Sequence, residues 1–149
     1  MIVCRITSTA HAKALTASGR PARWNPEGKK MIYTAASISL ACLENVVHRS
    51  GEGLSSSFNI LFIEIPDEVA VKEILLSSLP ANWKDFENYR HTQDLGNRWL
   101  NSLESALLKV PSAIVQQENN YLINPVHPYF KKIRIIKSEL FKFDTRIKK

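Results

Sequence analysis

The chain has 149 residues, of which 44% are hydrophobic and 23% are charged, a composition typical of a globular protein rather than a disordered one. This length fits a single domain spanning residues 1–149, and the net charge of +6 resides in the segment 131–149. No run approaches the roughly 20 apolar residues that cross a bilayer, and the N-terminus becomes polar too early for a signal-peptide core, so we expect a cytoplasmic protein that does not contact a membrane.

The first third of the chain predicts two strands and a helix. Residues 2–6 are apolar apart from one arginine and indicate a strand, and the Gly- and Pro-containing stretch 18–30 indicates a long loop. A short strand is predicted at 31–35. Ser37 can cap the helix that follows, because apolar residues recur at helical spacing over 38–49.

The middle of the chain predicts one strand followed by two further helices. A polar connection at 51–57 leads into a buried strand at 58–65, which ends at a proline. Residues 67–76 begin with acidic side chains, which favour a helix start, and indicate a helix. After a loop at 79–83, a further helix is expected at 93–104.

Short β-type segments dominate the last third of the chain. The predicted strands are 107–110, 113–117, 121–123, 133–137 and 140–143. Because helices and strands do not alternate regularly, the sequence predicts an α+β fold with mainly antiparallel sheets and flanking helices.

Several familiar chemistries have no support in the sequence. There is no GxGxxG fingerprint and no GxxxxGK[ST] phosphate loop, so a Rossmann-type dinucleotide site is not expected. The four histidines are scattered, and Cys4 and Cys42 are isolated in apolar surroundings. We therefore expect no metal site, and we interpret the cysteines as reduced and buried.

Polar residues within apolar, structure-forming segments are the candidates for function. Glu44 follows an apolar stretch of the predicted helix, where a carboxylate is either paired with a cation or exposed in a cleft. Arg23 lies in the long loop and could clamp a phosphate or stack on Trp24. Arg20 competes with Arg23 for the phosphate-binding role.

Two further residues stand out among apolar neighbours. Arg5 shares one strand face with Val3, and this face lines a pocket or lies in solvent. Ser112 follows Pro111 between two predicted strands and lacks the GxSxG motif, which argues against a hydrolase nucleophile.

The basic segment 131–149 supports a hypothesis from another class. Its basic side chains could bind nucleic acid or an acidic protein, but its basic and apolar residues alternate, which favours a folded, solvated strand. A nucleic-acid-binding module using this segment stays an alternative.

Taken together, these motifs resemble the RES family, which is named for its Arg, Glu and Ser. The resemblance runs nearly from end to end, and its pieces in chain order include Arg23-Trp24-Asn25, Tyr33-Thr34-Ala35, Leu43-Glu44, Trp99-Leu100, Val110-Pro111-Ser112-Ala113 and Asn124-Pro125. One departure is Ala22, where the family usually has a glycine before the loop arginine.

The resemblance implies an ADP-ribosyltransferase-like fold and a toxin that depletes NAD⁺ by cleaving its nicotinamide–ribose bond. NAD⁺ is then the substrate, and no cofactor is implied. The implied catalytic residues are Arg23, Tyr33, Glu44 and Ser112, and those implied to bind NAD⁺ are Arg5, Arg23, Tyr33 and Ser112. Water, phosphate or a macromolecule could accept the ribosyl group, so an ADP-ribosyltransferase that modifies a macromolecule is the close alternative.

The family also implies partners. They are an Xre-type helix-turn-helix antitoxin that neutralises the toxin and a second toxin copy within a hetero-oligomer. DNA would be reached only through the antitoxin.

Overall fold

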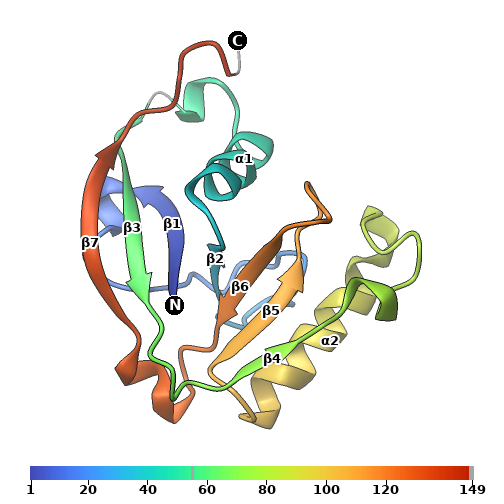
Figure 1. The fold of residues 1–149 in the computed structure, drawn as a ribbon. Helices are drawn as coiled ribbons and strands as arrows, with labels where there is room; N and C mark the ends of the chain where they lie inside the picture. The colour runs from blue at the N-terminus through green and yellow to red at the C-terminus, as the bar shows by residue number, and fades with distance from the viewer. Residues whose placement is uncertain (55, 148–149) are drawn as a thin grey trace.

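The computed structural model describes residues 1–54 and 56–147, which form one curved sheet with two longer helices (Figure 1). The strands are β1 (Ile2–Ser8), β2 (Ile32–Ala35), β3 (Phe58–Glu64), β4 (Val71–Glu73), β5 (Leu107–Pro111), β6 (Asn119–Ile123) and β7 (Arg134–Phe141), and the helices are α1 (Ile38–His48) and α2 (Tyr89–Ser102). Their order across the sheet is β4-β5-β6-β2-β1-β3-β7. Among the described strands, only β4 and β5 pair in parallel. The predicted α+β class with mainly antiparallel strands is therefore confirmed.

The sheet has a weak join at its centre, between β1 and β2. Each residue of β1 pairs with one of β3, whereas one pair, Cys4 with Ala35, links β1 to β2. β2 instead pairs along its length with β6. Figure 1 shows the two resulting groups of strands, with β1, β3 and β7 on one side and β6, β5 and β4 on the other.

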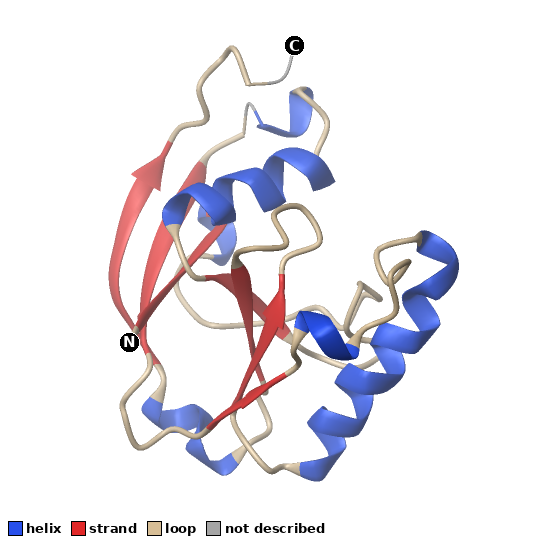
Figure 2. Cartoon of the chain, turned by 45° about the vertical axis from the view of Figure 1, so that its right-hand side comes forward, coloured by secondary structure: helices blue, strands red, loops and turns tan. Residues whose placement is uncertain are grey.

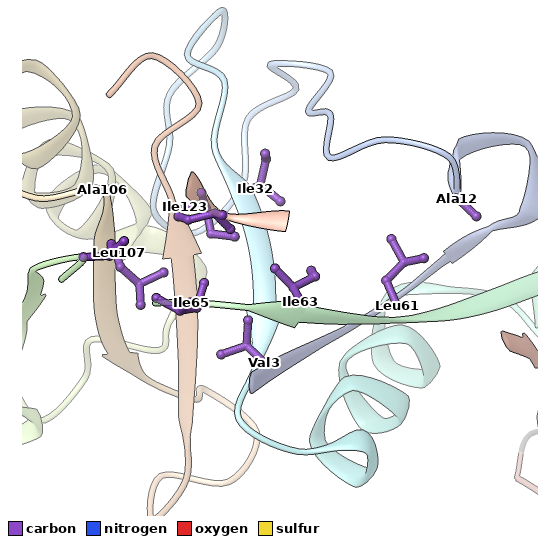
Figure 3. Close-up of a cluster of buried hydrophobic side chains, with 11 residues drawn as sticks. Val3, Ala12, Ile32, Leu61, Ile63, Ile65, Ala106, Leu107 and Ile123 are labelled. Carbon is purple, nitrogen blue, oxygen red and sulfur yellow. The ribbon is translucent and has the colours of Figure 1, made fainter. Parts of the chain in front are cut away.

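A cluster of aliphatic side chains holds these two groups together on one face of the sheet (Figure 3). Val3 of β1 and Leu61 of β3 pack there with Ile32 of β2 and Ile123 of β6, all fully buried. Burying an aliphatic side chain of this size contributes about 1.5–3 kcal/mol. The cluster therefore opposes separation of β1 from β2.

Helix α1, which the sequence predicts over 38–49, covers part of the other face. The Ser37 hydroxyl accepts a hydrogen bond from the Leu40 amide at 3.1 Å and caps the helix start. Leu40 and Ala41 are buried in a cluster with Cys4 and Ile60. The helix ends at His48, one residue before the predicted end.

Helix α2 packs beside β4 and β5 (Figure 2). It runs from Tyr89 to Ser102, earlier in the chain than the predicted 93–104. Trp99 and Leu100 enter a cluster with Leu108 of β5. The next residue, Leu103, adopts the left-handed conformation, with φ of 53°, and ends the helix.

The prediction of a helix over 67–76 is wrong. Val71–Glu73 forms β4, which pairs with β5, and the Ile74 amide extends this ladder by donating to the Lys109 carbonyl at 2.9 Å. Val69 is buried and Ile74 packs against the core, whereas Leu75 and Leu76 are exposed. Strand pairing outweighs the local preference of the sequence.

Two other strand predictions need correction. Residues 113–117 form a turn, because the Ser112 hydroxyl accepts hydrogen bonds from the amides of Ile114 and Val115, both at 3.1 Å. Residues 133–137 and 140–143, predicted as two strands, contribute mainly to one continuous strand, β7, which follows β3 with one bulge near its middle. Continuous pairing with β3 joins the segments.

The remaining predicted segments agree with the structure within its described range. Residues 18–30 and 79–83 are loops, and the 51–57 connection contains a short 3₁₀ helix at Glu52–Leu54. Residue 55 of that connection, and Lys148 and Lys149 of the basic segment, lie outside the described residues. No helix in the described part of the chain is long and apolar enough to cross a membrane.

Candidate active site

A cavity of about 930 Å³ lies where β1 and β2 separate. Its lining includes Arg5 of β1, Tyr33 of β2, Arg23 of the long loop and Glu44 of α1. Its volume falls in the range of sites that bind small molecules and cofactors. Four of the five predicted site residues thus line one cavity, although they are distributed over residues 5 to 44 and over four segments.

Ser112, the fifth predicted residue, lies behind the cavity wall. It is 0% exposed, while its neighbours Pro111 and Ala113 line the cavity. Its hydroxyl donates a hydrogen bond to Oε1 of Glu44 at 3.1 Å. The structure therefore joins Ser112 to the site through Glu44.

The two carboxylate oxygens of Glu44 have different surroundings. Oε1 accepts hydrogen bonds from Ser112 and from Nδ2 of Asn120 on β6, the latter at 2.6 Å. Oε2 lies 3.6 Å from Nε2 of His48, one helical turn along α1. The Glu44 side chain keeps 24% of its surface exposed, so it remains accessible from the cavity.

These contacts keep the Glu44 carboxylate ionised. Burial opposes ionisation and would raise the pKa of Glu44, but hydrogen bonds from His48, Asn120 and Ser112 outweigh burial and hold the pKa below its ordinary value. Glu44 is the only acidic residue among the described residues that line the cavity. The other charged side chains in that lining belong to Arg5, Arg23, Arg49 and Lys84, with His48 as a further titratable group.

Sequence reasoning missed His48 and Asn120. The spacing of four residues between Glu44 and His48 was a usable signal, because residues i and i+4 are neighbours on a helix. Asn120 lies two residues before the buried Leu122 on β6, so it projects from the same strand face. A polar residue at that position was the available signal.

Arg23 is held by residues 83–89, two of which, Lys84 and Tyr89, also line the cavity. Its Nη1 donates to the carbonyl oxygens of Trp83 and Lys84 at 3.3 and 3.0 Å. Its guanidinium lies over the Tyr89 ring, 4.5 Å from the centroid, and 5.3 Å from that of Trp83. Arg23 therefore stacks on Tyr89 and Trp83, and not on Trp24 as the sequence suggested.

The hydroxyl of Tyr33 is occupied by the loop that carries Arg23. It donates to Oδ1 of Asn25 at 2.7 Å and accepts from the Trp24 amide at 3.0 Å. Burial raises the pKa of Tyr33, so this phenol stays neutral. The ring lines the cavity while the hydroxyl fixes the loop.

Helix α2 holds the same loop from outside. Thr92 donates to the Arg23 carbonyl at 2.6 Å, and Gln93 donates to the Ala22 carbonyl at 2.8 Å. Gly96 allows the close approach, because a methyl group at this position would collide with the Trp24 carbonyl oxygen. Arg23 is thus positioned by backbone contacts as well as by its own side chain.

Arg5 completes the cationic part of the lining. Its Nη1 donates to the Thr16 carbonyl at 2.8 Å, and burial lowers the pKa of its guanidinium. Of the two environments the sequence left open for Arg5, the cavity wall is the one observed. Arg20, the alternative phosphate ligand, is exposed and does not line this cavity.

Among the described residues, no group of three or more His, Cys, Asp or Glu side chains is arranged to hold a metal ion.

The basic segment 131–149 forms several ion pairs over its described residues. Its pairs are Lys132–Glu68, Arg134–Glu64, Lys137–Glu139 and Arg146–Asp144. Much of the positive charge of this segment therefore already has a carboxylate partner.

Comparisons with known proteins agree in the family they indicate. The model of the family described as "RES domain" matches residues 2–144. "Prs ADP-ribosylating toxin" from Sphingobium sp. (strain YBL2) is 40% identical over 127 residues, which cover 84% of this chain and 79% of the relative. "Toxin Res" from Photorhabdus laumondii is 34% identical over 155 aligned positions, covering 100% of this chain and 98% of the relative.

A solved structure shares the fold at low sequence identity. It is the crystal structure of the M. tuberculosis MbcT–MbcA toxin–antitoxin complex, and a chain of it superimposes with a TM-score of 0.78 and 17% identity. The match covers 95% of this chain and 84% of the other.

Proposed function

This chain belongs to the RES domain family, and on that premise we propose that it is a toxin that cleaves the nicotinamide–ribose bond of NAD⁺. One observation carries the proposal. Glu44 is a carboxylate with a lowered pKa, and it faces a cavity whose other charged lining residues are cations. A bound dinucleotide has the complementary charges, with an anionic pyrophosphate and a ribose that becomes positive during bond cleavage.

The bond to be broken joins nitrogen N1 of nicotinamide to C1′ of ribose. Its electron pair leaves with nicotinamide, which becomes neutral, and the ribose passes through an oxocarbenium-like state. The ionised Glu44 stabilises this positive charge through Oε2 and can accept a hydrogen bond from a ribose hydroxyl. No proton has to be transferred to the leaving group.

The remaining site residues hold the substrate or Glu44. Arg5 and Arg23 bind the pyrophosphate with guanidinium N–H groups not used by the protein, and they align the scissile bond with Glu44. The ring of Tyr33 offers a flat surface to nicotinamide. Ser112 acts through Glu44, because its hydroxyl donates to Oε1 from behind the wall.

Replacing Glu44 by glutamine tests this proposal. Glu44→Gln keeps the size of the side chain and removes its charge, so we expect the rate of NAD⁺ loss to fall at least about 100-fold. Purified protein is incubated with NAD⁺, and free nicotinamide is quantified, with circular dichroism as the check on folding.

Glu64→Gln is the matched control. Glu64 of β3 pairs with Arg134 of β7 and does not line the cavity, so its variant should retain the parental rate. Parental activity in a folded Glu44→Gln protein would refute the proposal.

Transfer of ADP-ribose to a macromolecule is the second candidate. It is favoured by the name of the Sphingobium relative, an ADP-ribosylating toxin. When water is the acceptor, its oxygen bonds to C1′ and a proton is released, which gives free ADP-ribose. When phosphate is the acceptor, a phosphate oxygen bonds to C1′ and gives the phosphate ester of ADP-ribose. NAD⁺ labelled in its ADP-ribose portion separates the cases, because the label ends in ADP-ribose, its phosphate ester or a macromolecule.

We also propose partners for the toxin. They are an Xre-type helix-turn-helix antitoxin and a second toxin copy within the same assembly, with DNA contacted only by the antitoxin. The ion pairs of the basic segment weigh against direct nucleic-acid binding, because nucleic-acid affinity depends on cations that phosphates can neutralise.

A further inference from the structure

We propose that Asn120 is a positioning residue for Glu44, and that its side-chain amide fixes the orientation in which the carboxylate faces the cavity. The inference rests on the proposed function, because it assigns Asn120 to the site where NAD⁺ would be cleaved. It deepens that function by naming a residue that acts on the carboxylate from the sheet.

The geometry is asymmetric around Glu44. Asn120 lies in β6 and pairs with Ala35 of β2 and Val110 of β5, so its backbone is held on both sides. Its Nδ2 donates to Oε1 of Glu44 at 2.6 Å, and Ser112 donates to the same oxygen. With Oε1 held by these two donors, Oε2 has only the longer contact to His48, at 3.6 Å, and is the oxygen left for a ligand.

The orientation of the amide follows from the charge of Glu44. If the amide were reversed, its Oδ1 would take the place of Nδ2, 2.6 Å from a carboxylate oxygen. Two acceptors cannot share that contact when the carboxylate is ionised. Asn120 is therefore the donor, and Glu44 is the acceptor.

The other end of the amide shows that this contact has a structural cost. Oδ1 of Asn120 is buried and has no hydrogen-bond partner among the described residues. A buried acceptor without a partner destabilises the folded protein, and an apolar residue would avoid this cost. The hydrogen bond to Glu44 offsets this cost.

Glu44 keeps other contacts when the Asn120 side chain is removed. His48 contacts it from its own helix, and Ser112 contacts it from the turn after β5. The other titratable or charged groups of the cavity are Cys4, Arg5, Arg23, Tyr33, Arg49, Lys84 and Tyr89. His48 and Ser112 still favour the charged form of Glu44, so loss of Asn120 should weaken the site without neutralising the carboxylate.

Asn120→Ala in the full chain tests the inference through two measurements. The Glu44 carboxyl is titrated by ¹³C NMR, with Glu44→Gln identifying its signal, and NAD⁺ loss is measured as a function of pH. Because the ionised form loses a donor, we expect the pKa of Glu44 to rise by about one unit. The pH at which activity is lost on the acid side should rise by about the same amount. At neutral pH, kcat should fall about tenfold while KM changes less than about twofold.

Asn59→Ala is the matched control. Asn59 also lies in a strand and uses its side chain for hydrogen bonds, to Thr9 and Ser138, but it does not line the cavity. Its variant should leave both the Glu44 titration and the acid limb unchanged.

Asn120→Asp serves where the alanine variant does not fold, because it keeps the side-chain size. Here two carboxylates share one contact, so the upper pKa of the coupled pair should rise above the parental Glu44 value. An unchanged Glu44 titration and an unmoved acid limb in the folded variant would overturn the inference.

The two proposals can fail separately. The NMR titration requires no activity, so a parent protein that does not cleave NAD⁺ refutes the proposed function, while an Asn120-dependent titration still supports the positioning role. If the parent cleaves NAD⁺ but the Glu44 titration is the same in the parent and in the Asn120 variants, only the positioning role is refuted.

Discussion

Arg23 combines two tasks in a single side chain. Its guanidinium is bound to the carbonyls of Trp83 and Lys84 and stacked on Tyr89, yet it also lines the cavity. Five N–H groups make this combination possible, because the contacts to Trp83, Lys84 and Tyr89 leave donors available for a ligand. A lysine, with one point charge and no planar face, could not replace it at both tasks.

Comparing Arg23→Ala with Arg20→Ala tests the choice between the two loop arginines. Loss of a charge-assisted contact to the pyrophosphate should raise KM for NAD⁺ about tenfold or more in Arg23→Ala. Arg20 does not line the cavity, so Arg20→Ala should stay within about twofold of the parent. Steady-state kinetics on the two proteins provides the measurement, and equal effects would remove the reason for assigning Arg23 to the phosphate.

The residues of the site were predictable to different degrees. Arg5, Arg23 and Glu44 stand out in the sequence because each interrupts an apolar or structural segment. Asn120 does not, because its importance depends on which helix faces β6, and that is a tertiary contact. For Ser112 the residue was predicted but not its place, since its burial behind Glu44 depends on a turn that the sequence suggested was a strand.

At the scale of elements, the position of the Arg23 loop depends on α2. Thr92 and Gln93 bond to the loop carbonyls, and Gly96 lets the Trp24 backbone approach the helix closely. A helix that contributes only Tyr89 to the cavity lining therefore determines where one of its walls lies.

Gly96→Ala should disturb this contact. The added methyl group collides with the Trp24 carbonyl, so we expect destabilisation of about 1–3 kcal/mol and a Tm lower by about 3–10 °C. The displaced loop should also weaken NAD⁺ binding. Differential scanning calorimetry and KM measurement test both effects.

Gly53→Ala is the control for the glycine substitution. A Cβ at Gly53 would meet its nearest neighbour at 3.4 Å, an ordinary contact. This variant should melt within about 2 °C of the parent, since well-accommodated glycine replacements change stability by less than about 1 kcal/mol. An equal loss of stability in both variants would contradict the role given to Gly96.

Elements with a clear periodic pattern or capping residue were predictable, as α1 shows with its Ser37 cap. Elements defined by their partners were not. β4 has three residues and becomes a strand only because β5 lies beside it, and β7 is continuous because β3 supplies pairing along its length. Local sequence carries no information about such partners.

At the scale of the whole molecule, the charge distribution indicates which kind of ligand each surface can bind. The cavity gathers cations around Glu44, while the described cations of the basic segment largely pair with carboxylates on the surface. This difference supports a small anionic substrate in the cavity over a nucleic acid on the basic segment.

Cellular NAD⁺ measurement tests the toxin–antitoxin proposal. Induced expression of this protein should lower the cellular NAD⁺ concentration and arrest growth. Co-expression of the Xre-type antitoxin should restore the NAD⁺ concentration and growth. Glu44→Gln provides the inactive comparison. Growth arrest at normal NAD⁺ levels would instead favour modification of a macromolecule.

Because only Cys4 and Ala35 pair across the boundary between β1 and β2, the sheet consists of two groups of strands that are joined weakly. The aliphatic cluster of Figure 3 packs across this boundary on one face of the sheet, and residues of both β1 and β2 line the cavity. Val3, Ile32 and Leu61 belong to this cluster and do not line the cavity, so they support its shape only through the strands that carry them.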